Sequence, residues 1–196
     1  MKTKYDIILS AEESFARTVA LGVVVKRPLT AWHYLIPGMF LIDFLRRSAE
    51  IRKYSEHFLF PRRQALDAAQ SVLNGESSKE VIARAGKAIE VWLSSVGLFS
   101  QELQKSQMKA VQLLIEHYAA LMSAPGDSYY SLIENAYHDR RNYEAYVSRI
   151  ASAEQEVDRA ILEKLGETEV LREKLLAEER EVTRRRVREA DIAFSD

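Results

Sequence analysis

The sequence predicts an all-α protein, a helical bundle that ends in a long, coiled-coil-like helical hairpin. The 196-residue chain contains only 7 Gly and 4 Pro, fewer than the tight turns of a β-rich fold usually require. Residues that favour helices, such as Ala, Leu, Glu, Lys, Arg and Gln, dominate the composition. Apolar residues also recur at alternating steps of three and four, which is the spacing of a buried helix face.

The composition also excludes several classes of function. The chain has no Cys, so it has neither disulfides, nor thiolate catalysis, nor Cys-ligated zinc or iron–sulfur sites. Its 28 basic and 29 acidic residues leave a net charge of -1, which provides no overall field for nucleic acid. The apolar run within residues 1–10 is too short for a signal peptide. We therefore expect a cytoplasmic protein.

The first helix is expected to start at Ser10. Ser10 and Glu13 have the spacing of a capping box, in which each side chain bonds the other residue's backbone N–H. The β-branched run 23–25 also permits a short extended segment. Pro28 ends either structure.

Four further helices are predicted in the first part of the chain. Residues 39–58 form one, and Pro61 opens a short second one that ends at Gly75. Ser77 and Glu80 form a second capping box, which starts a helix with an apolar face from Val81 to Val96. The next helix carries apolar residues from Leu103 to Met122 and ends at residues 124–126, Ala-Pro-Gly.

From Asp127 the apolar pattern becomes a heptad seam of about four repeats. A single helix over 127–165 would be ~58 Å long, more than the ~42 Å diameter of a compact protein of this size. Gly166 permits a turn, so we divide the chain into a body, 1–125, and a helical hairpin, 127–196. The seam is the predicted interaction surface, with polar Arg140 and Glu154 setting its register. Its residues are Ile133, Arg140, Tyr143, Val147, Ile150, Glu154, Val157 and Ile161.

The segment 28–45 is unusually apolar and has basic residues on both sides, Lys26, Arg27, Arg46 and Arg47. Residues 37–38, Pro-Gly, divide it, so neither half is long enough to cross a membrane. One interpretation is a buried helix–turn–helix at the centre of the bundle. The other is a wedge that enters one leaflet of an anionic membrane while the basic residues contact lipid phosphates. The wedge residues would be Trp32, Tyr34, Leu35, Ile36, Met39, Phe40, Leu41 and Phe44.

The sequence shows no complete catalytic or metal-binding motif. It has no Gly-rich phosphate loop and no nucleophile elbow. Glu134 and His138 have helical spacing and could share an ion, with Glu116 as a further weak candidate, but no second carboxylate–His pair completes a site. We therefore expect neither an enzyme nor a cofactor.

The last predicted helix carries a basic cluster, Arg184, Arg185, Arg186 and Arg188. These cations can complement the helix dipole and pair with the preceding glutamates. Alternatively they form a docking face on which Ile192 and Phe194 are apolar anchors. Tyrosines and arginines also alternate over 129–149, as in some single-strand-binding proteins, but acidic residues lie among them and nucleic acid is not favoured.

Together these features predict a non-enzymatic adaptor or assembly subunit. It would bind a protein partner, or a second copy of itself, through the long C-terminal helices. One alternative is a peripheral membrane protein that uses the segment 28–45. Another is a helical-bundle enzyme that holds a metal or cofactor.

Overall fold

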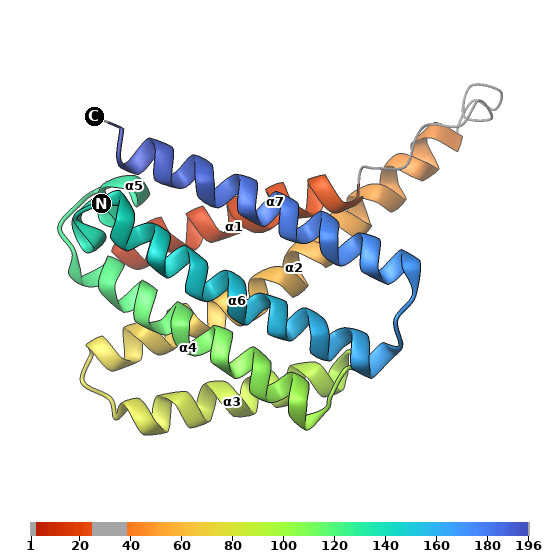
Figure 1. The fold of residues 1–196 in the computed structure, drawn as a ribbon, viewed down its shortest axis with the longest axis horizontal. Coiled ribbons are helices and arrows are strands. Elements are labelled where there is room, and N and C mark those ends of the chain that lie inside the picture. The colour runs from red at the N-terminus through yellow and green to blue at the C-terminus, as the bar shows by residue number, and fades with distance from the viewer. Residues whose placement is uncertain (1–2, 25–38, 196) are drawn as a thin grey trace.

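The computed structural model describes residues 3–24 and 39–195, with side chains for 3–24 and 48–195. Seven α-helices and no strands occur in this part of the chain, which confirms the predicted all-α bundle (Figure 1). The helices are α1 Lys4–Val24, α2 Met39–Leu73, α3 Ser78–Ser95, α4 Gln101–Ser123, α5 Tyr129–Tyr137, α6 Arg140–Leu165 and α7 Glu169–Ala193.

Helix α1 begins at Lys4, so the predicted start at Ser10 is wrong. Thr3 and Asp6 already form the reciprocal cap. The Thr3 N–H donates to Asp6 Oδ2 at 3.0 Å and the Asp6 N–H donates to Thr3 Oγ1 at 3.2 Å. The helix runs to Val24, which also rules out an extended segment at Val23 and Val24.

Helix α2 continues through Pro61, so the two helices predicted here are one. A proline inside a helix costs about 3 kcal/mol when nothing supports it. In this chain Pro61 is buried and α2 packs against α1, α3 and α4, which offsets that cost. Gly75, with φ 92°, follows the end of the helix as predicted. The first turns of α2 extend past the rest of the bundle (Figure 1).

The predictions for α3 and α4 are confirmed in their bounds. Ser77 precedes α3, although its side chain makes no capping hydrogen bond, so the predicted box does not form. Ser100 caps α4 by accepting from the Leu103 N–H at 3.1 Å, and the helix ends before Ala124. The apolar faces of both helices are buried, as expected of core helices.

The predicted single helix over 127–165 is wrong, because the chain breaks between α5 and α6. His138 has a positive φ of 65°, and the side chain of Asp139 accepts from the Asn142 N–H at 2.8 Å to cap the new helix. The heptad pattern hides this break, since Ile133 and Tyr143 are buried on either side of it.

Helices α6 and α7 follow each other around Gly166, which has a φ of 81°, so the predicted turn is confirmed. The pair lies along the body instead of projecting from it: α6 packs on α4, and α7 packs on α1 (Figure 1). Helices α1 and α7 approach closely at Gly22, where an added Cβ atom would lie 2.3 Å from Glu181 Cγ and the Glu181 side chain would have to move. Toward Gly166, α6 and α7 move apart (Figure 1).

Candidate functional site

A cavity of about 930 Å³ lies between α2, α3, α4, α6 and α7. Much of its wall is apolar and comes from Phe58, Trp92, Val157, Ile161 and Leu175. These side chains are only partly buried, because the cavity leaves part of their surface without a protein neighbour. Small-molecule sites in proteins have volumes of roughly 300–1,000 Å³ with a mostly apolar lining and a few polar groups. This cavity has both properties.

One end of the cavity is formed by a buried ionic network that joins α1, α2, α6 and α7. Arg62 Nη2 lies 2.9 Å from Glu154 Oε1, and Arg62 Nη1 lies 3.4 Å from Glu12 Oε2. Arg186 binds both Glu154 oxygens, at 2.7 and 2.8 Å. Both arginines are 5% exposed. A bidentate pair and a shared carboxylate are the arrangement that makes buried guanidinium groups tolerable.

The charges in this network stabilise one another. Burial by itself would raise the pKa of Glu154, but Arg186 and Arg62 outweigh it and hold that pKa below its usual value. The Arg62 guanidinium also lies over the rings of Phe58 and Phe15, at 4.4 and 4.9 Å from their centroids. The network is therefore ionised at neutral pH and fixes four helices at one end of the cavity.

The other polar part of the cavity carries three carboxylates, Asp158 on α6 and Glu178 and Glu179 on α7. The Tyr54 hydroxyl donates to Glu178, and Gln155 Nε2 donates to Glu179 at 2.7 Å. Asp158 has no hydrogen bond or ion pair with any described residue. Burial, and then the charges of Glu178, Glu154 and Glu179, raise its pKa to about 7.

A buried histidine lies in an aromatic cluster of α4, α5 and α6. His117 Nδ1 is 2.8 Å from the Tyr137 hydroxyl, and the imidazole stacks on Tyr146 with centroids 4.3 Å apart. Burial, and then the charges of Arg186 and Arg62, lower its pKa to about 3. His117 is therefore neutral at physiological pH and contributes no charge to the bundle.

Most residues of the predicted interaction seam contact other helices of the same chain. Ile133, Tyr143 and Ile150 are in the main core, at 0–2% exposure, while Val157 and Ile161 line the cavity and Val147 packs against the core. Glu154, predicted as a polar seam position, is the shared partner of two arginines. Arg140 lies on the surface and pairs with Glu144 and Asp191. The adaptor role stays a prediction, but the exposed apolar seam on which it was based is largely covered by other helices of the same chain.

Half of the residues of the predicted docking tail, Arg185, Arg186 and Phe194, are buried or partly buried within the bundle. Arg186 is buried in the ionic network, Arg185 pairs with buried Glu189 at 3.1 Å, and the Phe194 ring lies 6.1 Å from that of Tyr143. The expectation that Phe194 has nothing to pack on is therefore wrong. The exposed residues of the predicted tail are Arg184, Arg188 and Ile192.

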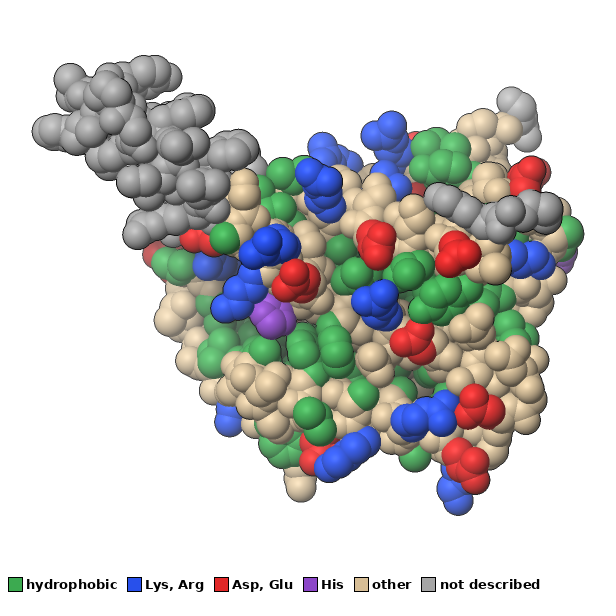
Figure 2. All heavy atoms as spheres, turned by 180° about the vertical axis from the view of Figure 1, so that it is seen from behind, with side chains coloured by type: hydrophobic (Ala, Val, Ile, Leu, Met, Phe, Trp, Pro, Cys, Tyr) green, Lys and Arg blue, Asp and Glu red, His purple; other side chains and the backbone are tan. Residues whose placement is uncertain are grey.

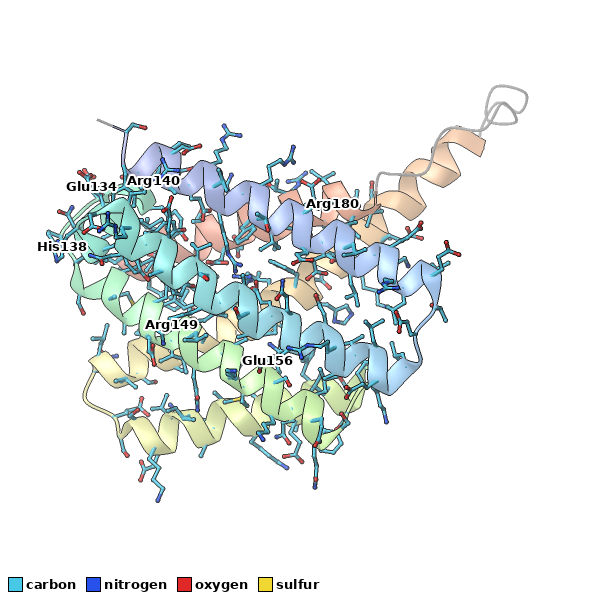
Figure 3. All side chains as sticks on the ribbon, viewed as in Figure 1. Glu134, His138, Arg140, Arg149, Glu156 and Arg180 are labelled. Atoms are coloured by element: carbon cyan, nitrogen blue, oxygen red, sulfur yellow. The ribbon has the colours of Figure 1, made fainter. Side chains whose placement is uncertain are left out.

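The weak metal candidates do not form a site. Glu134 and His138 lie at the end of the bundle where α5 meets α6 (Figure 3), and Glu116 on α4 pairs instead with Arg149 at 3.3 Å. Within the described residues, no group of three acidic or histidine side chains is arranged to hold a metal ion. The surface opposite Figure 1 carries interspersed acidic and basic side chains (Figure 2), so this face offers no extended basic stripe for nucleic acid.

The predicted membrane wedge falls outside what the structure describes. The chain at Lys26, Arg27, Trp32, Tyr34, Leu35 and Ile36 is not described, and neither are the side chains of Met39, Phe40, Leu41, Phe44, Arg46 and Arg47. Among the helices of 3–24 and 39–195, none has a stretch long and apolar enough to span a bilayer.

Most polar residues of the cavity and of its ionic network were not predicted from the sequence, although a signal was present. Glu12 lies between buried Ile8 and Phe15 at helical spacing, and Glu178 lies between Leu175 and Val182 in the same way. A charged residue within an apolar helix stripe is rarely buried unless it is paired. Such positions can be found in sequence, but their partners on other helices cannot.

Comparison with protein-family models, with curated proteins and with solved structures finds no match for this chain. The function must therefore be argued from the geometry of the cavity.

Proposed function

We propose that this protein is a non-enzymatic binding protein whose interhelical cavity holds a small amphipathic molecule. The observation that carries the proposal is the cavity of about 930 Å³, with a largely apolar wall and a few charged residues in its lining. An amphipathic ligand would bury its apolar part against Trp92, Val157 and Leu175 and direct its polar group to the charged residues.

The chemistry of the lining favours binding over catalysis. Arg62, Arg186 and Glu154 are occupied with one another, so none of them is a free acid, base or electrophile. His117 is neutral and paired with Tyr137, and it does not line the cavity. The described lining carries the hydroxyls of Tyr54, Ser95 and Thr183. Tyr54 donates to Glu178 and Ser95 to the backbone carbonyl of Trp92, and neither Ser95 nor Thr183 forms a hydrogen bond with a basic side chain that could activate it as a nucleophile.

Energy transfer from Trp92 to a neutral apolar dye tests this proposal. Trp92 lines the cavity and Trp32 is the other tryptophan of the chain, so a Trp32→Phe variant makes Trp92 the single donor. Phenylnaphthylamine fluoresces when it enters an apolar site and accepts energy from tryptophan. We expect saturable quenching of Trp92 with a stoichiometry of one dye per chain.

A pair of identical substitutions provides the control. Val157→Phe introduces a ring into the cavity and should abolish the transfer, whereas Val170→Phe adds the same ring on α7 at a position that is 65% exposed and outside the cavity. Thermal unfolding of both variants checks that each is folded. Equal dye binding by the two variants, or no saturable binding by the parent, would contradict the proposal.

A second candidate function is association with an anionic membrane. The first turns of α2 extend past the bundle (Figure 1), and the sequence from Met39 to Leu45 contains one charged residue, Asp43. A projecting apolar helix end next to basic residues suits insertion into one leaflet. In a Trp92→Phe variant, the emission of Trp32 should shift to the blue with anionic vesicles and not with zwitterionic ones. An unchanged spectrum without co-sedimentation would exclude this function.

A further inference from the structure

The two arginines of the cavity are already neutralised by protein carboxylates. Glu154 accepts one hydrogen bond from Arg62 and two from Arg186, at distances of 2.7–2.9 Å. Glu12 lies 3.4 Å from the other Nη of Arg62. Because these two carboxylates balance the charges of the two guanidinium groups, the network offers an anionic ligand no net positive charge.

The rest of the polar lining has an excess of negative charge. Asp158, Glu178 and Glu179 lie on α6 and α7, on the Gly166 side of the ionic network, where these helices move apart. The groups that donate to the two glutamates, from Tyr54 and Gln155, are neutral. Besides the two paired arginines, Lys53 is the lining's one Lys or Arg in the described chain, and it lies on the exposed side of α2.

Among the three carboxylates, Asp158 is the one to which a ligand could supply a missing hydrogen bond or ion pair. The described residues offer it no hydrogen bond or ion pair, and Glu178, Glu154 and Glu179 all repel its charge. A neutral ligand would leave this repulsion in place, and an anion would increase it. A cation at about 4 Å gains favourable energy with each of these carboxylates, more so in a partly buried site than in water.

We infer that the cavity takes a hydrophobic amine, with its ammonium group between Asp158 and Glu178 and its apolar body against Trp92, Ile161 and Leu175. This inference rests on the proposed binding function and adds the chemical class of the ligand. Both carboxylates line the same cavity, from α6 and α7, and the charge of Glu178 acts on Asp158, so an ammonium group placed between them would interact favourably with both. The apolar wall accommodates an alkyl or aromatic body.

Three probes with the same body and different charge test the inference. We would titrate phenylbutylamine, phenylbutanol and phenylbutyrate into the full chain by calorimetry at about pH 8, where a carboxyl with a raised pKa is ionised. The amine should bind roughly tenfold more tightly than the alcohol, and the acid more weakly than either. Asp158→Asn should lower the affinity for the amine by roughly tenfold and leave that for the alcohol unchanged. Glu163→Gln, an exposed change on the same helix, should alter neither.

The affinity for the amine should fall between about pH 8 and about pH 6, because protonation of Asp158 removes its charge. Other titratable or charged groups of the cavity are Glu154, Glu178, Glu179 and Arg186 on α6 and α7, and Lys53, Tyr54, His57 and Arg62 on α2. The lining residues of α3 and α4 are Trp92, Ser95, Gln107, Ala110 and Leu114, none of which titrates near neutral pH. Comparison of the parent with Asp158→Asn therefore isolates the contribution of this carboxyl.

The outcomes separate this inference from the proposed function. If phenylbutanol binds as tightly as phenylbutylamine, if phenylbutyrate binds most tightly, or if Asp158→Asn leaves the preference for the amine intact, the amine inference is overturned while binding in the cavity stands. If phenylnaphthylamine binds and all three of these probes fail, the amine inference is also overturned. If neither the dye nor any probe binds, both fall together.

Discussion

Replacing Glu154 by Gln should destabilise this protein strongly, because Glu154 holds two buried arginines. The substitution keeps the size of the side chain and removes its charge. Arg186, which is 5% exposed, then loses its charged partner at 2.7 and 2.8 Å, and Glu12, at 3.4 Å, is the one carboxylate left to Arg62. The amide oxygen of glutamine can still accept from the guanidinium groups, but as a neutral acceptor. The amide N–H₂ of glutamine would also point at a guanidinium, where it has nothing to donate to.

The expected cost follows from the burial of the two cations. Breaking a buried ion pair by removing one partner costs about 3–5 kcal/mol. The side chain of Glu154 is 30% exposed to the cavity, so water can replace part of the lost interaction and we expect about 3 kcal/mol. For a chain of this length, that corresponds to a fall in melting temperature of roughly 6–12 °C.

Urea unfolding followed by circular dichroism measures this change, and Glu156→Gln is the matched control. Glu156 lies on the same helix and pairs with Lys109 at 2.6 Å, but on the surface, so its loss should barely move the unfolding midpoint. Because the folded pKa of Glu154 is lowered, its stabilisation is present at neutral pH and is lost as the pH falls through that pKa. The difference between parent and variant should therefore shrink in acid. Equal midpoints for the two variants at neutral pH would refute the importance of the network.

Three further changes test other parts of the structure. Asp158→Asn should stabilise the protein by about 2 kcal/mol at about pH 8 and by little at about pH 4, because a raised pKa makes ionisation of Asp158 unfavourable in the folded state. Urea unfolding over this pH range, with Glu163→Gln as control, measures the change. A stability difference between parent and variant that does not vary with pH would contradict this prediction. His138→Gly should raise the free energy of unfolding by about 0.5–1 kcal/mol in the same assay, because His138 has a φ of 65°, a conformation that glycine adopts without steric cost. A loss of stability would mean that the imidazole makes a contact that the fold needs. Deleting residues 184–196 should abolish the cooperative thermal transition, because it removes Arg186 and a buried part of α7; an unchanged melting temperature would show that this tail is not core.

Local signals allowed several helices to be predicted correctly. The bounds of α3 and the end of α4 were foreseen because Ser77 and the Ala-Pro-Gly sequence that follows α4 lie next to strongly amphipathic stretches. At two other positions a local sequence signal predicted a helix boundary that the structure does not have. Ser10 has the capping spacing but lies inside α1, since Thr3 and Asp6 cap the helix earlier, and Pro61 is carried within α2 by tertiary packing. Only the backbone of His138 shows that the heptad seam is interrupted.

The candidate site could be predicted only in part. The predicted seam contains Glu154, Val157 and Ile161, all of which line the cavity, because their spacing placed them on the inner face of one helix. It does not contain Arg62, Asp158 or Glu178. Glu178 can be recognised as a charge within the apolar stripe of its own helix, but the environment of all three residues depends on which other helices lie opposite.

The sequence by itself determined that the chain is helical, where most of its turns fall, and which face of each helix is apolar, because these properties depend on neighbours within a few residues. The tertiary structure decided that α6 and α7 lie against the body and separate toward Gly166. It also decided that Glu12, Arg62, Glu154 and Arg186 meet at one end of a cavity, with Asp158 left unpaired among the described residues. Charges on different helices interact only once packing has fixed the distances between them, and no local pattern specifies those distances.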